Sequence, residues 1–311
     1  CMTAKDKKDL PFGITHNVDF IALSFVRRVS DILELRAMLA KAKSSAKIIA
    51  KIETEEAIKN IDAIIAETDG VMVARGDLAV EVPAQEVPML QKMIIKKCNE
   101  LGKPVIVATQ MMESMIHSPV PTRAEVSDVA NSILDGADAV MLSEESALGQ
   151  YPVEAVEMMS RVALSVEKNY PHRAALYGKL MASDTNANDV YKGTVDAVTF
   201  AVVSTAYAVH ARAIVALTES GLTARMISRY RPKQPIIVMS PRSETVSQLA
   251  LSFGCSPTRI NTFSHITDVM KKVRAFVLAH KLAKKGDSVV ISAGIPFGQA
   301  GGTNLLLVEI I

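Results

Sequence analysis

Charged side chains stand where two apolar runs of the sequence end. Lys51 and Glu53 close one β-branched run, and because side chains at i and i+2 of a strand share a face, the ammonium and the carboxylate point the same way. Asp77 closes the next run behind Gly76, which has no side chain to keep a ligand away from the backbone. Two carboxylates from adjacent strand ends suit a hard divalent ion such as Mg²⁺, and a lysine beside it can neutralise charge on a transferring phosphoryl group. The plainer alternative is an ion pair between Lys51 and Glu53.

A threonine ends a third apolar run. The Thr109 hydroxyl could relay a proton or hold a water molecule, and capping of the following helix is the alternative. Farther along, Thr122 and Glu125 have the spacing of a capping box. That pair therefore predicts a helix start rather than chemistry.

A second polar cluster lies in the other half of the chain, between an apolar run and a helical stretch. Its members combine hydroxyls with a glycine at a helix start, which together can hold a phosphate: Thr218, Ser220, Gly221 and Thr223. An ordinary Ser/Thr helix cap is the alternative. The loop over residues 298–304 could fold over the same place.

The first half of the chain repeats a short apolar run followed by an amphipathic stretch. The predicted strands cover residues 19–25, 47–53, 70–77, 104–110 and 139–144. The predicted helices cover residues 30–43, 55–67, 84–101, 122–134 and 152–168. Alternation of this kind predicts a parallel sheet, and in a β/α barrel the strand ends meet at the rim where active sites form. Because a closed barrel uses eight strands, we interpret residues 1–170 as the last five βα units of a (β/α)8 TIM barrel, with three strands upstream.

The periodicity lapses over residues 171–189, which we interpret as a linker. Residues 190–311 carry a second α/β series. Its predicted strands cover residues 213–217, 235–239, 258–263, 287–293 and 305–311. Its predicted helices cover residues 193–210, 222–230, 243–253 and 266–284. This order predicts an open, three-layer α/β domain, in which the last strand pairs antiparallel because only a loop connects it to its predecessor.

Bulk composition excludes several classes of protein. The mean hydropathy of +0.21 fits either a membrane protein or parallel sheets buried on both faces, and no run approaches the roughly 18 apolar residues of a spanning helix. With 35 basic and 33 acidic residues mixed along the chain, no clustered basic face indicates nucleic-acid binding. Three widely spaced cysteines argue against a disulfide frame and for a reducing, cytoplasmic compartment. Cys98, among apolar helix positions, is expected to be inert core.

Taken in order, the motifs resemble those of pyruvate kinases. They are Lys-Ile-Glu at 51–53, Val-Ala-Arg-Gly-Asp-Leu at 73–78, Ala-Thr-Gln-Met at 108–111 and Pro-Thr-Arg-Ala-Glu-Val-Ser-Asp-Val-Ala-Asn at 121–131, followed by Asp-Gly-Ala-Asp at 135–138. The resemblance implies phosphoryl transfer from phosphoenolpyruvate to ADP, giving pyruvate and ATP, with Mg²⁺ (or Mn²⁺) and K⁺. It implies Lys51 at the phosphoryl group, Glu53 and Asp77 on the metal, Gly76 and Asp77 N–H groups on the substrate carboxylate, and Thr109 near the methylene carbon.

The resemblance also implies regulation and assembly. It points to an effector pocket at residues 218–223 for a sugar phosphate or a nucleotide, and to a homotetramer with no nucleic-acid or membrane partner. Glu219, and Leu222 where the family often has arginine, favour a singly phosphorylated effector. At 142–147 the chain reads Leu-Ser-Glu-Glu-Ser-Ala where the family usually has Leu-Ser-Gly-Glu-Thr-Ala, so Glu144 adds a charge at the rim.

Two other functions remain open on the sequence. The family carries three barrel strands, a lid domain, and a phosphate- and K⁺-binding motif before the equivalent of Lys51, and the chain lacks them. It could therefore be an inactive fragment that binds effectors or forms oligomers. It could also be another Mg²⁺-dependent barrel that handles phosphoenolpyruvate or pyruvate, a lyase or a mutase, although such an enzyme would not need the second domain.

Overall fold

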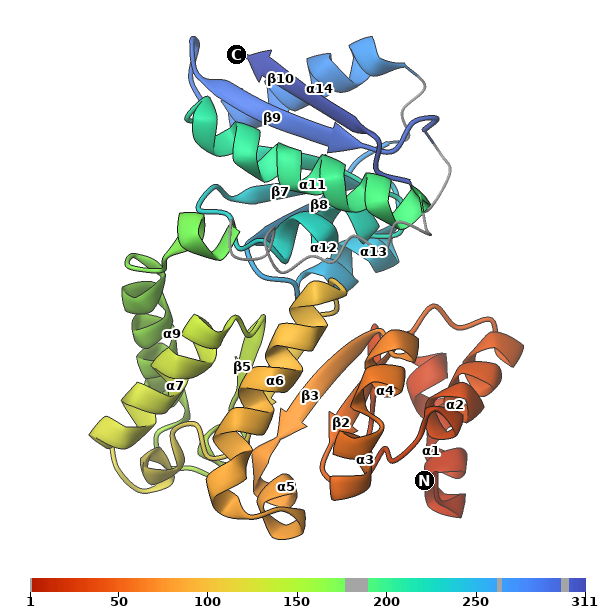
Figure 1. Ribbon diagram of the computed structural model, residues 1–311, viewed down its shortest axis with the longest axis vertical. Helices are drawn as coiled ribbons and strands as arrows, with labels where there is room; N and C mark the ends of the chain where they lie inside the picture. The colour runs from red at the N-terminus through yellow and green to blue at the C-terminus, as the bar shows by residue number, and fades with distance from the viewer. Residues whose placement is uncertain (1, 177–189, 262–264, 298–301) are drawn as a thin grey trace. The chain divides into compact units, whose positions relative to one another are not determined.

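The computed structural model describes residues 2–176, 190–261, 265–297 and 302–311. The chain divides into two compact units, residues 1–170 and 171–311, each with its own sheet and core (Figure 1). Residues 177–189 of the predicted linker lie outside the described residues. Just before them, Leu176 is fully buried in the core of the second unit, so this part of the predicted linker packs with that unit. None of the described helices has the length and apolarity needed to span a membrane.

The first unit contains a parallel sheet of five strands in sequence order. They are β1 (Phe20–Leu23), β2 (Lys47–Ile52), β3 (Gly70–Ala74), β4 (Val105–Ala108) and β5 (Ala139–Met141). Every neighbouring pair is parallel, which confirms the predicted series of βα units. The third strand is shorter than predicted: it ends at Ala74, because the chain enters a helix at Arg75.

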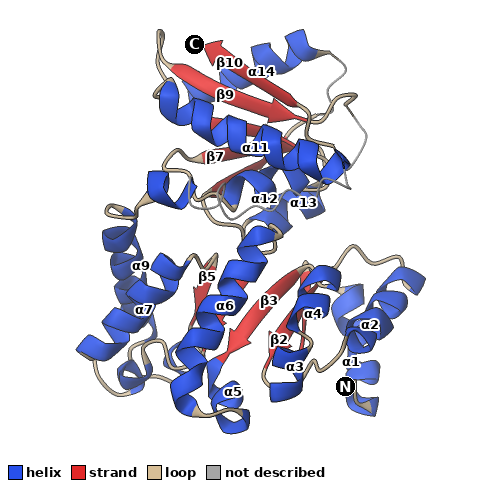
Figure 2. Cartoon of the chain, viewed as in Figure 1, coloured by secondary structure: helices blue, strands red, loops and turns tan. Residues whose placement is uncertain are grey.

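Helices precede, connect and follow these strands (Figure 2). They are α1 (Ala4–Thr15), α2 (Val29–Lys41), α3 (Glu55–Lys59), α4 (Ile61–Glu67), α5 (Arg75–Glu81), α6 (Val87–Glu100), α7 (Arg123–Asp135), α8 (Glu144–Ala147) and α9 (Pro152–Glu167), with short 3₁₀ turns η1 (Ala84–Glu86) and η2 (Glu113–Ile116). The helix predicted over 55–67 is two helices that meet at Asn60. The Asn60 side chain donates to the Glu56 and Arg27 carbonyls at this break. The Thr122–Glu125 capping box is confirmed at the start of α7.

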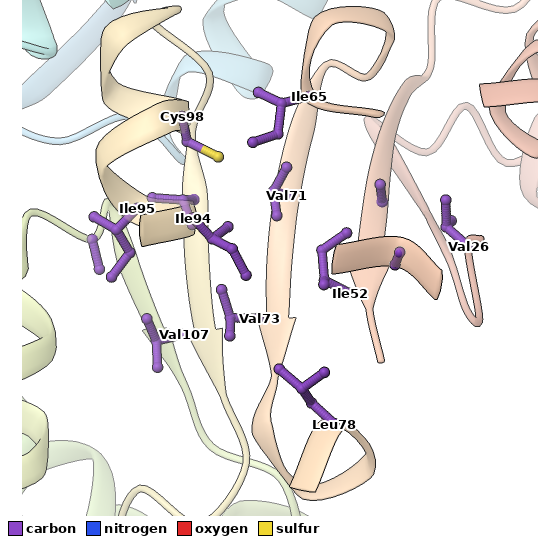
Figure 3. Close-up of a cluster of buried hydrophobic side chains, with 14 of the residues drawn as sticks. Val26, Ile52, Ile65, Val71, Val73, Leu78, Ile94, Ile95, Cys98 and Val107 are labelled. Atoms are coloured by element: carbon purple, nitrogen blue, oxygen red, sulfur yellow. The ribbon is translucent and has the colours of Figure 1, made fainter. Parts of the chain in front are cut away.

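One face of the first sheet packs on the helices. The alternate residues Ile48, Ala50 and Ile52 of β2 belong to the same buried cluster as Val71, Val73, Val105 and Val107. Figure 3 shows Val71 and Val73 of β3 beside Ile94, Ile95 and Cys98 of α6. Cys98 is fully buried, and burial raises the pKa of its thiol, as expected for inert core.

The second unit has a five-stranded sheet with helices on both faces. Its strands, in the order β10-β9-β6-β7-β8, are β6 (Ile214–Leu217), β7 (Ile236–Ser240), β8 (Cys255–Arg259), β9 (Ser288–Ala293) and β10 (Leu305–Ile310). Its helices are α11 (Val190–Ala208), α12 (Leu222–Ser228), α13 (Ser243–Leu249) and α14 (Ile266–Ala279). Two separate buried clusters cover the two faces of the sheet, one with residues of α11, α12 and α13 and the other with residues of α14.

Two strand predictions in this unit had different outcomes. The antiparallel pairing of β10 with β9 is confirmed. The strand predicted over 258–263 is wrong in its position, since β8 covers Cys255–Arg259. Strand β8 contains Pro257, but it pairs only with β7 and so lies at the edge of the sheet, where a residue without an N–H is tolerated.

Candidate active site and effector loop

The register of the first sheet brings the candidate residues to one edge. Ile52 of β2 lies opposite Val73 of β3, and Ala74 lies opposite Ala108 of β4. Glu53, Arg75 and Thr109 therefore each follow the last paired residue of neighbouring parallel strands. Lys51 and Glu53 alternate with the helix-facing Ala50 and Ile52, so they lie on the other face of the sheet.

Lys51 and Glu53 form a close pair that β1 supports. Lys51 Nζ lies 2.6 Å from Glu53 Oε1 and donates to Ser24 Oγ at 2.9 Å. The N–H of Phe25 donates to Glu53 Oε2 at 2.6 Å, from a backbone with a positive φ of 51°. Ser24 and Phe25 follow the end of β1, so two consecutive residues after one strand hold the two charged groups at the end of the next. The sequence did not reveal the contact between Ser24 and Lys51.

Glu53 retains capacity for another ligand. Its side chain is fully buried, and Oε1 has no hydrogen bond of good geometry among the described residues, although the Lys51 ammonium lies at ion-pair distance from it. An oxygen in that state suits a small hard cation that would bind it directly. Asp77, in the first turn of α5, is exposed at the same edge of the sheet. Within the described ranges no group of three or more His, Cys, Asp or Glu side chains could hold a metal, so a metal here would rely on these two carboxylates.

Thr109 is bonded to the start of α5. The N–H of Gly76 donates to Thr109 Oγ1 at 2.8 Å, and the Thr109 hydroxyl donates to the Ala108 carbonyl at 2.6 Å. We expected the Gly76 N–H to hold a substrate carboxylate. In this structure that N–H already donates to Thr109. The alternative that Thr109 caps the following helix is wrong, because η2 begins after Met112.

Two charged residues, whose roles the sequence did not reveal, hold the loop after β4. Arg75 donates to the Thr109 carbonyl at 2.7 Å. Glu145, 2% exposed, accepts from the N–H groups of Met112 at 3.1 Å and Ser143 at 2.7 Å. Glu144, which stands where the family usually has glycine, is exposed, and so its added charge faces solvent.

In the second unit the polar loop folds on itself. Gly221 N–H donates to Thr218 Oγ1 at 3.0 Å, and Gly221, with a φ of 83°, precedes α12. No side chain caps α12, so the simple Ser/Thr cap is wrong. Thr223 is 2% exposed, and its hydroxyl lies 2.7 Å from that of Thr303. Residues 298–301 of the loop expected to cover this place lie outside the described residues, but Thr303, which follows them, reaches it.

Comparison with known proteins decides the family. The family described as "Pyruvate kinase, barrel domain" matches residues 1–156, and "Pyruvate kinase, alpha/beta domain" matches residues 196–309. The chain belongs to the pyruvate kinase family. A pyruvate kinase of Geobacillus stearothermophilus is 50% identical over all of this chain and 52% of its own length, and that of Clostridium acetobutylicum is 44% identical over all of this chain and 64% of its own length. The crystal structure of a pyruvate kinase from Cryptosporidium parvum matches 99% of this chain and 62% of its own, with a TM-score of 0.92 and 38% identity.

Membership of the pyruvate kinase family confirms the resemblance and the fold class drawn from the sequence. The second unit also matches, so the whole chain resembles the pyruvate kinase family and not only a barrel of the kind that a lyase or mutase would share. The chain spans about half the length of most of the curated relatives it matches.

Proposed function

We propose that the protein containing this chain transfers a phosphoryl group from phosphoenolpyruvate to ADP, giving pyruvate and ATP. The observation that carries the proposal is the Lys51–Glu53 pair: a half-buried ammonium lies 2.6 Å from a fully buried carboxylate oxygen that has no well-formed hydrogen bond among the described residues. Family membership and the glycine and threonine at the neighbouring strand ends support it.

Each residue has a distinct proposed role. Lys51, steadied by Ser24, neutralises charge on the phosphoryl group as it leaves one oxygen and joins another. Glu53 and Asp77 would hold Mg²⁺ or Mn²⁺, which supplies charge neutralisation for the phosphate oxygens when it is bound. Gly76 and Asp77 would face the substrate carboxylate at the start of α5. Thr109 would give a proton to the methylene carbon of the enolate.

Several finer assignments rest on family membership. We propose K⁺ as a second ion, a homotetramer as the assembly and the cytoplasm as the compartment. We also propose that residues 218–223 receive a singly phosphorylated sugar or a nucleotide through Thr218, Ser220, Gly221 and Thr223. The backbone turn closed by Thr218 supports this, whereas buried Thr223 would act by holding Thr303 in place.

One assay tests the reaction, and a binding measurement tests the effector loop. Pyruvate formation is followed with phosphoenolpyruvate, Mg²⁺ and K⁺, with and without ADP, for this chain alone and for the longer protein that contains it. Pyruvate that depends on ADP supports the proposal, and its absence from the longer protein refutes it. Turnover by the chain alone at the rate of an intact relative would instead reject the inactive-fragment alternative.

For the effector loop, Ser220→Ala should weaken binding of a sugar monophosphate in calorimetry, and unchanged binding would show that Ser220 does not belong to the effector site.

A further inference from the structure

Thr109 and Gln110 have an uncommon backbone. Their φ angles are 71° and 56°, in the left-handed region that few residues other than glycine adopt and that a β-branched threonine adopts least readily. Such a conformation persists only where surrounding contacts impose it, and it concentrates at functional sites. The contacts that hold Thr109 therefore bear on its chemistry.

Arg75, the first residue of α5, supplies the strongest of these contacts. Its Nη2 donates to the Thr109 carbonyl at 2.7 Å and lies 2.9 Å from Met111 Sδ. Its Nη1 lies 2.7 and 2.6 Å from the two carboxylate oxygens of Asp128, on α7. The Arg75 side chain is only 12% exposed, so water competes little for its bond to the Thr109 carbonyl, whereas the Asp128 side chain is 36% exposed.

Arg75 and its neighbour hold both polar ends of the same threonine. The side chain of Arg75 binds the Thr109 carbonyl, while the N–H of Gly76 binds the Thr109 hydroxyl. Because Arg75 and Gly76 are consecutive, the start of α5 fixes the direction of the hydroxyl and the backbone that carries it. A planar guanidinium directs separate N–H groups at the carbonyl and at the carboxylate, whereas a lysine ammonium can bind both only if both lie around one nitrogen atom.

We propose that Arg75, fixed by Asp128, is a positioning residue that acts through Thr109. This inference rests on the proposed function, in which phosphoryl transfer leaves the enolate of pyruvate. The Thr109 hydroxyl gives its proton to the methylene carbon, a C–H bond forms, and the threonine oxygen regains a proton from solvent. Arg75 touches none of the reacting atoms; it keeps the hydroxyl where that proton can be delivered.

The first test measures the loop directly, without reference to activity. Hydrogen–deuterium exchange is followed in peptides covering residues 109–116 of the protein that contains this chain. Arg75→Lys and Asp128→Asn should each speed exchange of this loop by about tenfold. Arg36→Lys is the matched control, since Arg36 Nη2 also donates to a carbonyl, of Glu67 at 2.6 Å, and pairs with Asp69 at 3.1 Å. Loop exchange that is unchanged in both test variants overturns the inference.

The second test separates proton delivery from phosphoryl transfer. Exchange of the pyruvate methyl protons in D₂O, with ATP and Mg²⁺, is followed by NMR. Thr109→Ala should slow it by about 100-fold and Arg75→Lys by about tenfold, whereas the KM for phosphoenolpyruvate should change little. In the Thr109→Ala background, Arg75→Lys should cost nothing further. A second tenfold loss there would overturn the inference, whereas a wild-type protein without any activity would refute the proposed function and leave the loop measurement to decide on Arg75.

Discussion

Substitution of Gly76 tests whether this glycine is required for folding or for ligand binding. It lies in the first turn of α5, and its φ is not among the positive ones. The three atoms nearest to a Cβ at this position would be Oγ1, Cβ and Cγ2 of Thr109, at 3.5, 3.7 and 3.8 Å, which are ordinary van der Waals distances. Alanine therefore fits among the described residues, and a ligand that approaches the backbone is the reason for glycine that we test.

The expected effects of Gly76→Ala have opposite signs. Unfolding should become harder by about 0.5 kcal/mol, because alanine loses less backbone entropy than glycine on entering a helix. Phosphoenolpyruvate should bind about tenfold more weakly, since the methyl group would occupy the space through which the substrate carboxylate approaches the backbone. This factor corresponds to the loss of one hydrogen bond to a charged group, at about 1.5 kcal/mol, because the Gly76 N–H already donates to Thr109 and only the Asp77 N–H is left for the substrate.

Stability and binding need separate measurements. The chain has no tryptophan whose fluorescence could report either event, so other methods are used. Urea unfolding is followed by circular dichroism, and phosphoenolpyruvate binding is measured by calorimetry in the presence of Mg²⁺. Gly136→Ala is the control: its φ is 100° and a Cβ would lie 2.8 Å from Asn99 Nδ2, so this variant should lose about 1–2 kcal/mol of stability. Wild-type affinity in Gly76→Ala would refute the close approach of the substrate, and a stability loss like that of the control would refute the packing argument.

Four further predictions concern single residues. Lys51→Met should lower kcat by about 10³-fold while Mn²⁺ binding, measured by electron paramagnetic resonance, survives; retained turnover would leave Lys51 as a structural ion pair. Ser24→Ala should lower kcat about fivefold in steady-state assays, because Lys51 loses its hydroxyl partner. Burial opposes ionisation of Glu125, but hydrogen bonds from Ser114 and Thr122 outweigh it and hold its pKa below the ordinary 4.5. Its stabilisation is therefore present above that pH and lost as pH falls through the lowered pKa, so in thermal unfolding the deficit of Glu125→Gln should shrink as the pH falls below 4.5. Cys98 should react with thiol reagents only after unfolding, as peptide mass spectrometry would show.

What could be predicted from the sequence was mostly local. Lys51 and Glu53 were found because the two-residue period of a strand and the end of an apolar run are both visible in the sequence. The capping box at Thr122 was found because its two members are only three residues apart. The strand ranges of the first sheet were close, since buried parallel strands are short, apolar and β-branched.

What could not be predicted depends on contacts between distant residues. Arg75 lies far from Asp128 and Thr109 in the sequence. No sequence pattern predicts that its guanidinium binds both the Asp128 carboxylate and the Thr109 carbonyl. The positive φ of Thr109 was equally hidden, because a β-branched residue argues against it and only the surrounding bonds impose it. Helix α1 was missed for a different reason: it is charged and contains Pro11, so its helical periodicity is weak.

The bonds at the rim follow the order of the strands, and this order sets how the site should fail. The end of β1 holds the charged pair of β2 through Ser24 and Phe25, and the residue after β3 holds Thr109 after β4. Each chemical group is thus fixed from the neighbouring strand end, and α7 adds Asp128 behind Arg75. Truncation of the Ile94 side chain of α6, which lies in the helix-facing core, should therefore lower the free energy of unfolding by several kcal/mol and leave the geometry of the site nearly unchanged. A change at a rim contact should alter the geometry of the site and leave the free energy of unfolding nearly unchanged, because it removes one bond from the site and almost no buried apolar area.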